Sequence, residues 1–133
     1  MTLKVDIEAR QDYLYAAVSG EFTLRAAQAA YDRVVHAALP LAQTRILIDA
    51  RGVSGNPQPD ERYALGVYIA NEQRLLAERR PPIHVKVAVL GHQPVVDPQR
   101  LGETVAVNRG AKVKVSEQLD EALAWLGISA AAR

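Results

Sequence analysis

The stretch Arg45-Ile46-Leu47-Ile48-Asp49 is a short, nearly continuous apolar run near the middle of the chain. Such a run is typical of a β-strand that is covered on both faces. A turn-rich stretch follows directly, Arg51-Gly52-Val53-Ser54-Gly55-Asn56-Pro57-Gln58-Pro59. Pro59 suits the first position of a helix, which we expect to run to about Arg80. A buried strand that leads through a turn into a long helix indicates a parallel α/β sheet.

The residues before this stretch predict a hairpin and a helix. Apolar and charged side chains alternate over residues 3–9, which favours a half-buried strand at the edge of a sheet. A second strand, residues 13–19, follows after only two residues, so the pair is expected to be antiparallel. Thr23 is placed to cap a helix whose apolar positions recur at helical spacing until Pro40 ends it.

The residues after the stretch continue the alternation of strands and helices. We expect a strand over 83–90, a helix from Asp97-Pro98 to Asn108, a strand over 112–115, and a last helix capped by Ser116 and ended by Gly127. The order is β-β-α-β-α-β-α-β-α, which predicts a mostly parallel five-stranded sheet with one antiparallel edge strand. We expect one domain over residues 1–127 and a frayed tail over 128–133.

Composition excludes several classes of protein. Apolar residues make up 49% of the 133, and the 16 basic and 15 acidic residues give a net charge of +1, which is unlike a nucleic-acid binder. The chain has no cysteine, which excludes thiol catalysis and cysteine-ligated zinc. Charged residues interrupt the first twenty positions, and no run approaches the roughly 18 apolar residues of a membrane span. We therefore expect a cytoplasmic protein without a membrane span.

Sequence motifs for catalysis and for cofactors are weak or missing. The phosphate-binding loop and the glycine-rich dinucleotide fingerprint are both absent. The three histidines, His36, His84 and His92, fall on different predicted elements and have no metal-ligand spacing. We therefore expect no cofactor and no metal.

A hydrolase is the alternative that these residues leave open. Ser54 or Asp60 would act with His92, and Asp49 would complete a triad with Ser54 and His92. However, Ser54 lacks the strand-to-helix elbow that exposes a nucleophile, and Asp60 at a helix start is explained by the helix dipole. We expect a protein that is not an enzyme.

A binding site is expected at the carboxyl ends of the parallel strands, where open α/β sheets hold their ligands. The loop after residues 45–49 and the helix start that follows it supply most of the candidates, the loop after residues 83–90 supplies one, and a predicted helix end supplies two. The alternative is that these polar residues only build turns and caps. The candidates are Arg51, Ser54, Asn56, Asp60, Arg62, Tyr63, His92, Asn108 and Arg109.

The long helix that starts near Pro59 has more apolar positions than one stripe requires. They run from Tyr63 to Leu76 and cover more than one face. This surplus indicates a buried helix, a partner surface or an apolar ligand. Pairing of the helix with its own copy across a two-fold axis would make a homodimer.

The predicted topology and three stretches together resemble the SpoIIAA-like family. These stretches are Ile46-Leu47-Ile48-Asp49 with Arg51-Gly52-Val53, Glu103-Thr104-Val105 with Asn108-Arg109-Gly110, and the closing Leu119 to Leu126. The family is a bacterial branch related to STAS domains and shares its fold with CRAL-TRIO lipid-binding domains. The resemblance implies a binding or regulatory module that contacts a protein partner or a small amphipathic or anionic ligand.

The sequence departs from the pattern of the related STAS domains at one place. An anti-anti-sigma STAS domain carries Asp-Ser-Ser-Gly where the helix after this strand starts, and a kinase phosphorylates one of the serines. The matching stretch here is Pro57-Gln58-Pro59-Asp60, which has no hydroxyl. A closed pocket between the long helix and the sheet would favour a small ligand, whereas a flat exposed patch would favour a protein partner.

Overall fold

The computed structural model describes residues 2–129. In chain order the elements are β1 (Lys4–Ala9), β2 (Leu14–Glu21), α1 (Leu24–Ala38), a short 3-10 turn (Leu39–Leu41), β3 (Arg45–Ser54), α2 (Pro59–Ala77), β4 (Lys86–Leu90), α3 (Leu101–Asn108), β5 (Val113–Ser116) and α4 (Leu119–Leu126). This is the predicted order of strands and helices. Within the described residues, no helix combines the length and the apolar character that crossing a membrane requires.

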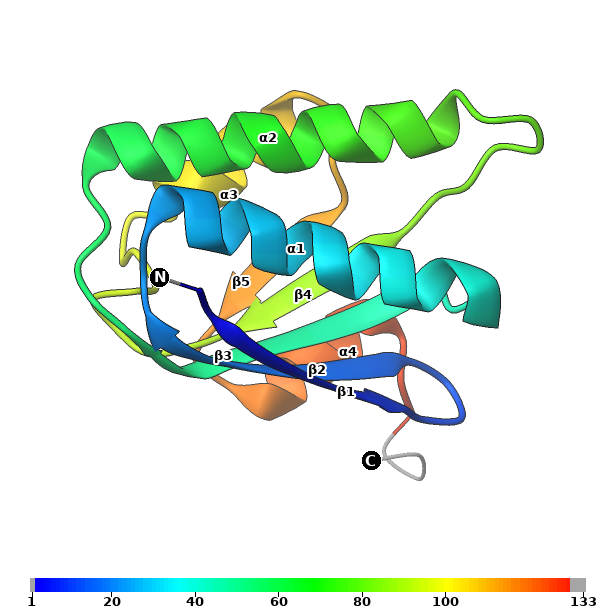
Figure 1. The fold of residues 1–133 in the computed structure, drawn as a ribbon, viewed down its shortest axis with the longest axis horizontal. Helices are drawn as coiled ribbons and strands as arrows, with labels where there is room; N and C mark the ends of the chain where they lie inside the picture. The colour runs from blue at the N-terminus through cyan, green and yellow to red at the C-terminus, as the bar shows by residue number, and fades with distance from the viewer. Residues whose placement is uncertain (1, 130–133) are drawn as a thin grey trace.

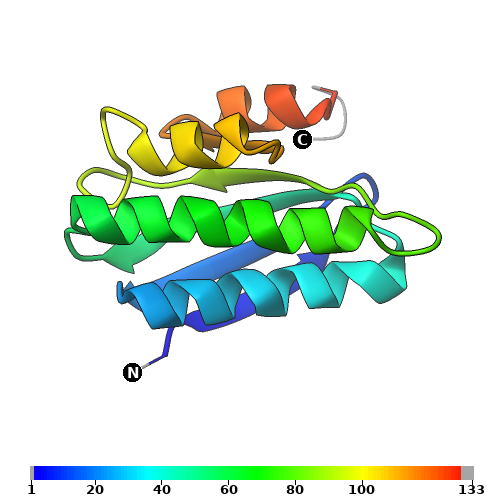
Figure 2. The same cartoon turned by 90° about the horizontal axis from the view of Figure 1, so that it is seen from above.

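The five strands lie in one sheet in the order β1-β2-β3-β4-β5. β1 is antiparallel to β2, and the other neighbouring strands are parallel, as predicted. Each parallel crossover moves one strand further in the same direction. Right-handed crossovers of this kind place their helices on one face of the sheet, and Figures 1 and 2 show α1, α2 and α3 together on that face. α4 follows the last strand and covers the opposite face.

β3 is buried on both faces, as its apolar run predicts. Ile46 and Ile48 belong to the core beneath α1 and α2, and Leu47 belongs to the smaller core beneath α4. The strand is longer than predicted because Gly52 to Ser54 continue to pair with β2. The register shifts by one residue between Ala17 and Ser19, and β3 holds the extra residue as a bulge.

The predicted cap at Thr23 and the predicted stop at Gly127 are observed, whereas α3 and α4 start later than predicted, and Gln118 takes the place of Ser116 as the cap of α4. The Thr23 hydroxyl accepts a hydrogen bond from the Ala26 N–H at 3.1 Å, and Gly127 ends α4 in the left-handed conformation at φ 81°. α3 begins at Leu101, four residues later than expected. Asp97 still caps this helix, because its carboxylate accepts hydrogen bonds from the N–H groups of Gln99 and Leu101 across an intervening turn.

The packed domain extends one residue beyond the predicted boundary at Gly127. Ile128 is 2% exposed and packs in the core beneath α4. Its N–H donates to the Leu123 carbonyl at 3.0 Å, which holds the chain against the helix it has just left. Residues 130–133 of the predicted tail lie outside the described residues.

Two glycines set the distance between α2 and α3. A Cβ on Gly66 would lie 2.5 Å from the Gly102 carbonyl oxygen, and a Cβ on Gly102 would lie 3.0 Å from the Arg62 carbonyl oxygen. α2 is therefore packed between α1 and α3 as well as against the sheet. This packing accounts for Gly66, Ile69, Ala70 and Leu76, which are buried, while Tyr63 and Leu75 stay exposed. The homodimer through this helix stays a prediction.

We predict that Gly66→Ala lowers the free energy of unfolding by about 1–3 kcal/mol, because the new methyl group overlaps backbone that cannot move without separating the helices. Alanine is otherwise the better helix former. The sign of the change in the free energy of unfolding therefore tests whether the two helices approach this closely. Gly102→Ala, with its wider contact of 3.0 Å, should cost less. Urea denaturation measures both variants, and a Gly66→Ala protein as stable as the wild type would contradict the prediction.

Candidate functional site

The residues predicted for a binding site lie in three separate places. Ser54, Asn56, Asp60, Arg62 and His92 lie at the carboxyl-terminal rim of the sheet, on the end of β3, the start of α2 and the loops 55–58 and 91–100. The remaining four lie elsewhere: Arg51 on the other face of the sheet, and Tyr63, Asn108 and Arg109 on α2 and α3.

Arg51 lies on the α4 side of the sheet, which corrects the expectation that it joins Asn56 and His92 at one rim. It sits at the bulge of β3, and its Nε and Nη2 donate to the two carboxylate oxygens of Asp49 at 2.9 and 2.8 Å. The Tyr15 hydroxyl donates to the same carboxylate at 2.6 Å. Tyr15 packs against the core beneath α4, which places this cluster on that face.

Asp49 is the buried member of this cluster, with 7% of its surface exposed. Burial opposes its ionisation, but hydrogen bonds from Arg51 and Tyr15 outweigh burial and hold the pKa of the Asp49 carboxyl below its ordinary value. The guanidinium is therefore committed to a structural partner.

We predict that Arg51→Ala lowers the free energy of unfolding by about 1–3 kcal/mol at pH 7, because it leaves a buried carboxylate with fewer partners. The folded-state pKa of Asp49 is depressed. Its stabilising contribution is therefore present above the unfolded-state pKa of about 4 and is lost as the pH falls through the folded-state value. The cost of Arg51→Ala should accordingly shrink at low pH, which urea denaturation at pH 7 and below pH 4 measures. An equal cost at both pH values would contradict this account.

Tyr63, Asn108 and Arg109 lie on the outer surface of α2 and at the end of α3. Nη2 of Arg109 donates to the Tyr63 hydroxyl at 2.9 Å, and its guanidinium lies 5.8 Å from the centre of the tyrosine ring. Asn108 is the last residue of α3, and Gly110 at φ 94° takes the left-handed turn after it. The contact between Arg109 and Tyr63 joins the two helices and is separate from the rim.

Arg62 joins the two rim loops. Its Nε donates to the Pro57 carbonyl at 3.0 Å and its Nη1 to the Val95 carbonyl at 2.9 Å, and Nη2 donates to the Pro94 carbonyl. The predicted loops do meet at one edge, therefore, and Arg62 is the residue that braces them.

Ser54 and His92 do not form a catalytic pair. The Ser54 hydroxyl lies 3.4 Å from the Gly20 carbonyl, to which it donates. Within residues 2–129, no hydrogen bond connects either Ser54 or Asp60 with His92. In the same part of the chain, no three His, Asp or Glu side chains are grouped closely enough to hold a metal ion.

A cavity of about 180 Å³ lies between the sheet and helices α1, α2 and α3, next to the braced rim. Almost all of its wall is apolar. Phe22, Val53 and Val95 belong to the wall and are half-buried. Other wall residues are Leu3, Val18, Ile48, Pro57, Leu65, Ile69, Val89, Val96, Val113 and Val115.

The cavity exists because the helices present small residues where they cross the sheet. Ala27 and Ala30 of α1, Gly66 of α2, and Gly102 and Ala106 of α3 all line it. The glycine contact holds α2 against α3 and leaves space between the helix layer and the strands. Sequence analysis missed this site, since alanines and glycines at core positions are also ordinary helix-packing residues.

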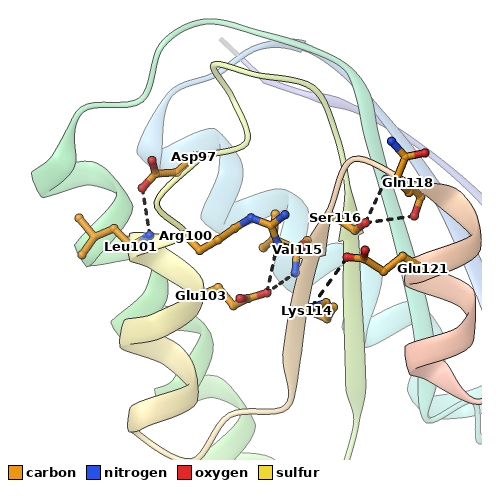
Figure 3. A network of polar contacts seen from close by, with 9 residues as sticks. All are labelled: Asp97, Arg100, Leu101, Glu103, Lys114, Val115, Ser116, Gln118 and Glu121. Atoms are coloured by element: carbon orange, nitrogen blue, oxygen red, sulfur yellow. Dashed lines mark hydrogen bonds and ion pairs between the residues drawn. The ribbon is translucent and has the colours of Figure 1, made fainter.

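Four charged residues line one end of the cavity, and each is held by the protein itself. Figure 3 shows that Glu103 accepts a hydrogen bond from the Val115 N–H, while Arg100 donates to the Val115 carbonyl and lies 3.9 Å from Glu103. The other two are Arg62, which is bound to three carbonyls, and Asp97. The N–H of Leu101 contributes most to holding the pKa of the Asp97 carboxyl below its ordinary value, and Arg62 and Arg100 add to it.

Comparison with known proteins identifies the fold. No family model matches the sequence, and no curated protein matches it. An anti-sigma factor antagonist from Mycobacterium paratuberculosis superposes over 95% of each chain with a TM-score of 0.55 at 14% identity. An uncharacterized DUF3478 protein from Shewanella loihica, described as having a SpoIIAA-like fold, matches over 94% of this chain and 93% of its own with a TM-score of 0.50 at 20% identity.

The chain has a SpoIIAA-like fold. The resemblance predicted from sequence is thereby confirmed at the level of the fold, including the mixed five-stranded sheet. Within this SpoIIAA-like fold, the stretch Pro57 to Asp60 lies where α2 begins, as the sequence comparison placed it. Oε1 of Glu61 accepts a hydrogen bond from the Gln58 N–H at 2.9 Å there, so a side chain of the chain itself occupies this helix start.

Proposed function

We propose that this protein is a non-catalytic binding module that holds a small, uncharged, mainly apolar ligand in the cavity beneath α1, α2 and α3. The observation that carries the proposal is the cavity itself, at about 180 Å³ and lined almost entirely by apolar side chains. Protein interiors are close-packed, with few voids larger than a water molecule. An apolar cavity of about 150 Å³ is large enough to bind benzene.

The position of the cavity supports a binding role. It lies beside the carboxyl ends of β2, β3 and β4, the edge where open α/β sheets bind ligands. Its rim is rigid, because Arg62 ties loop 55–58 to loop 91–100. A preformed apolar site with a few polar groups at one end is the usual form of a small-molecule site.

The charges at the cavity end select an uncharged ligand. Arg62 and Arg100 face Asp97 and Glu103, two positive groups against two negative ones, and each of the four already has protein partners. A carboxylate ligand would meet Asp97 and Glu103, and an ammonium would meet the two arginines. Bringing either charge into this apolar space would cost free energy without a dedicated counter-ion. The expectation of an anionic ligand is therefore not retained.

The proposal of a non-catalytic role rests on the arrangement at the rim. Nucleophilic catalysis requires a nucleophile and a base within hydrogen-bond reach, at roughly 2.6–3.2 Å. Ser54 is instead directed to the Gly20 carbonyl. This arrangement speaks against the alternative of a hydrolase that uses Ser54 or Asp60 with His92.

We predict that toluene raises the melting temperature of the wild-type protein and that Ala30→Leu removes this response, because the leucine side chain fills the cavity. Ala29→Leu is the matched control: it makes the same change on the exposed face of the same helix and should leave the response intact. Differential scanning calorimetry with and without toluene measures both. An equal response in the wild type and Ala30→Leu would place the ligand elsewhere.

Four probes of similar size test the charge of the ligand. We expect toluene and benzyl alcohol to bind, and benzoate and benzylammonium to bind at least ten-fold more weakly, since burying an unpaired charge costs more than 1.4 kcal/mol. Chemical shift changes of the backbone amides of Ala30, Ile69 and Ala106 report binding at the cavity. Comparable affinity for benzoate would show that the arginines are available to an anion, and no binding of any probe would refute the proposed function.

A protein partner is the second candidate. The structural match described as an anti-sigma factor antagonist supports it, as do the exposed side chains of Asn56, Asp60 and His92, for which no intramolecular side-chain hydrogen bond is seen in residues 2–129. These residues lie outside the cavity. Substituting Asn56 and His92 by Ala should weaken protein binding while leaving the toluene response unchanged.

A further inference from the structure

The two edges of the sheet differ in how their backbone groups are satisfied. At the β5 edge, the N–H of Val115 donates to Glu103 and its carbonyl accepts from Arg100 (Figure 3). At the start of the same strand, the Lys112 carbonyl instead accepts from the Val87 N–H of β4 at 3.1 Å, so this residue faces the neighbouring strand. Arg100 and Glu103, at the start of α3, therefore cover the outer edge at Val115.

The β1 edge has no such cover. Within residues 2–129, the backbone of Lys4–Ala9 has no hydrogen bond beyond its ladder with β2. Figures 1 and 2 show β1 at the margin of the sheet, with α1 above it and no element beside it. Ile7 is 38% exposed on this strand. An unpaired edge of this kind is a template for another strand.

We propose that two copies of the chain pair through β1, antiparallel and about a two-fold axis at Val5. The occupant is a second copy because one register makes the strand complementary to itself. With Val5 opposite Val5 of the second copy, Lys4 faces Asp6 and Asp6 faces Lys4, so two pairs of opposite charge form on the α4 side. On the helix side, Leu3 faces Ile7 and covers its exposed surface.

Other registers that keep apolar and charged faces aligned are less favourable. Because a slip of one residue would exchange the two faces, the axis must pass through a single residue. An axis at Asp6 pairs Lys4 with Glu8 twice, but it places the two Asp6 carboxylates directly opposite each other at the centre of the interface. An axis at Ile7 places Asp6 opposite Glu8 and Lys4 opposite Arg10, and like charges directly opposite each other are destabilising.

The side chains that would form these pairs are available. Lys4 and Asp6 are 74% and 69% exposed, and their charged atoms lie 3.6 Å apart within one chain, so both extend along the same face. An exposed pair of this kind stabilises a single chain little. Exchanging it for two pairs between copies costs little and adds backbone hydrogen bonds along the strand. The product is a continuous sheet with α1, α2 and α3 of both copies on one side.

Charge reversal tests this register. We expect sedimentation equilibrium of the wild type at tens of micromolar to give the mass of two 14.5-kDa chains. Lys4→Asp and Asp6→Lys should each weaken the dimer by about ten-fold or more, because each turns two attractive pairs into repulsive ones. The double variant K4D/D6K restores opposite charges and should restore the dimer. Glu8→Lys, which faces Thr2 in this register, is the control for a charge change on the same strand and should not weaken it.

Each result bears on the proposal. A wild type that stays monomeric at these concentrations would overturn β1 pairing. A dimer that persists in both single variants, or a double variant that stays as weak as the singles, would overturn the Val5 register. Circular dichroism spectra and melting temperatures of the monomeric variants show whether β1 still pairs with β2, so a folding defect is distinguished from a lost interface.

Discussion

The direction in which the chain crosses the sheet constrains the rest of this structure. Each parallel connection moves one strand further from β2 towards β5, and right-handed crossovers of this kind stack their helices on one face. Three helices must then share the surface of a five-stranded sheet. They fit because Gly66 and Gly102 let α2 and α3 approach each other at backbone distance.

This crowding on one face explains the cavity. Small side chains bring the helices close to each other. The same small side chains do not fill the space above the valines and the isoleucine that the strands contribute to the cavity wall. The result is an apolar space beside the strand ends, closed on one side by polar groups that are already paired. A site of this kind selects its ligand by shape and by the absence of charge.

The opposite face follows from the same topology. Within residues 2–129 α4 is the one helix that covers it, and Tyr15, Asp49 and Arg51 form a hydrogen-bonded cluster on this face. In the same residues β1 pairs with β2 alone, while Arg100 and Glu103 cover the opposite margin of the sheet at Val115. The domain therefore has one edge that side chains cover at Val115 and one edge that another strand can extend.

Local patterns in the sequence determined the order and type of the elements. The apolar run at Ile46 to Ile48, the cap at Thr23 and the stop at Gly127 act over a few residues, so they can be recognised without the fold. The rim was also predictable, because parallel strands bring their carboxyl ends together. The tertiary structure alone decided what the side chains contact: Tyr15 and Arg51 meet at Asp49 on the α4 face, Arg62 braces two loops, and the cavity depends on how closely two helices cross. These features arise from contacts between residues far apart in the chain, and no local period or spacing encodes them.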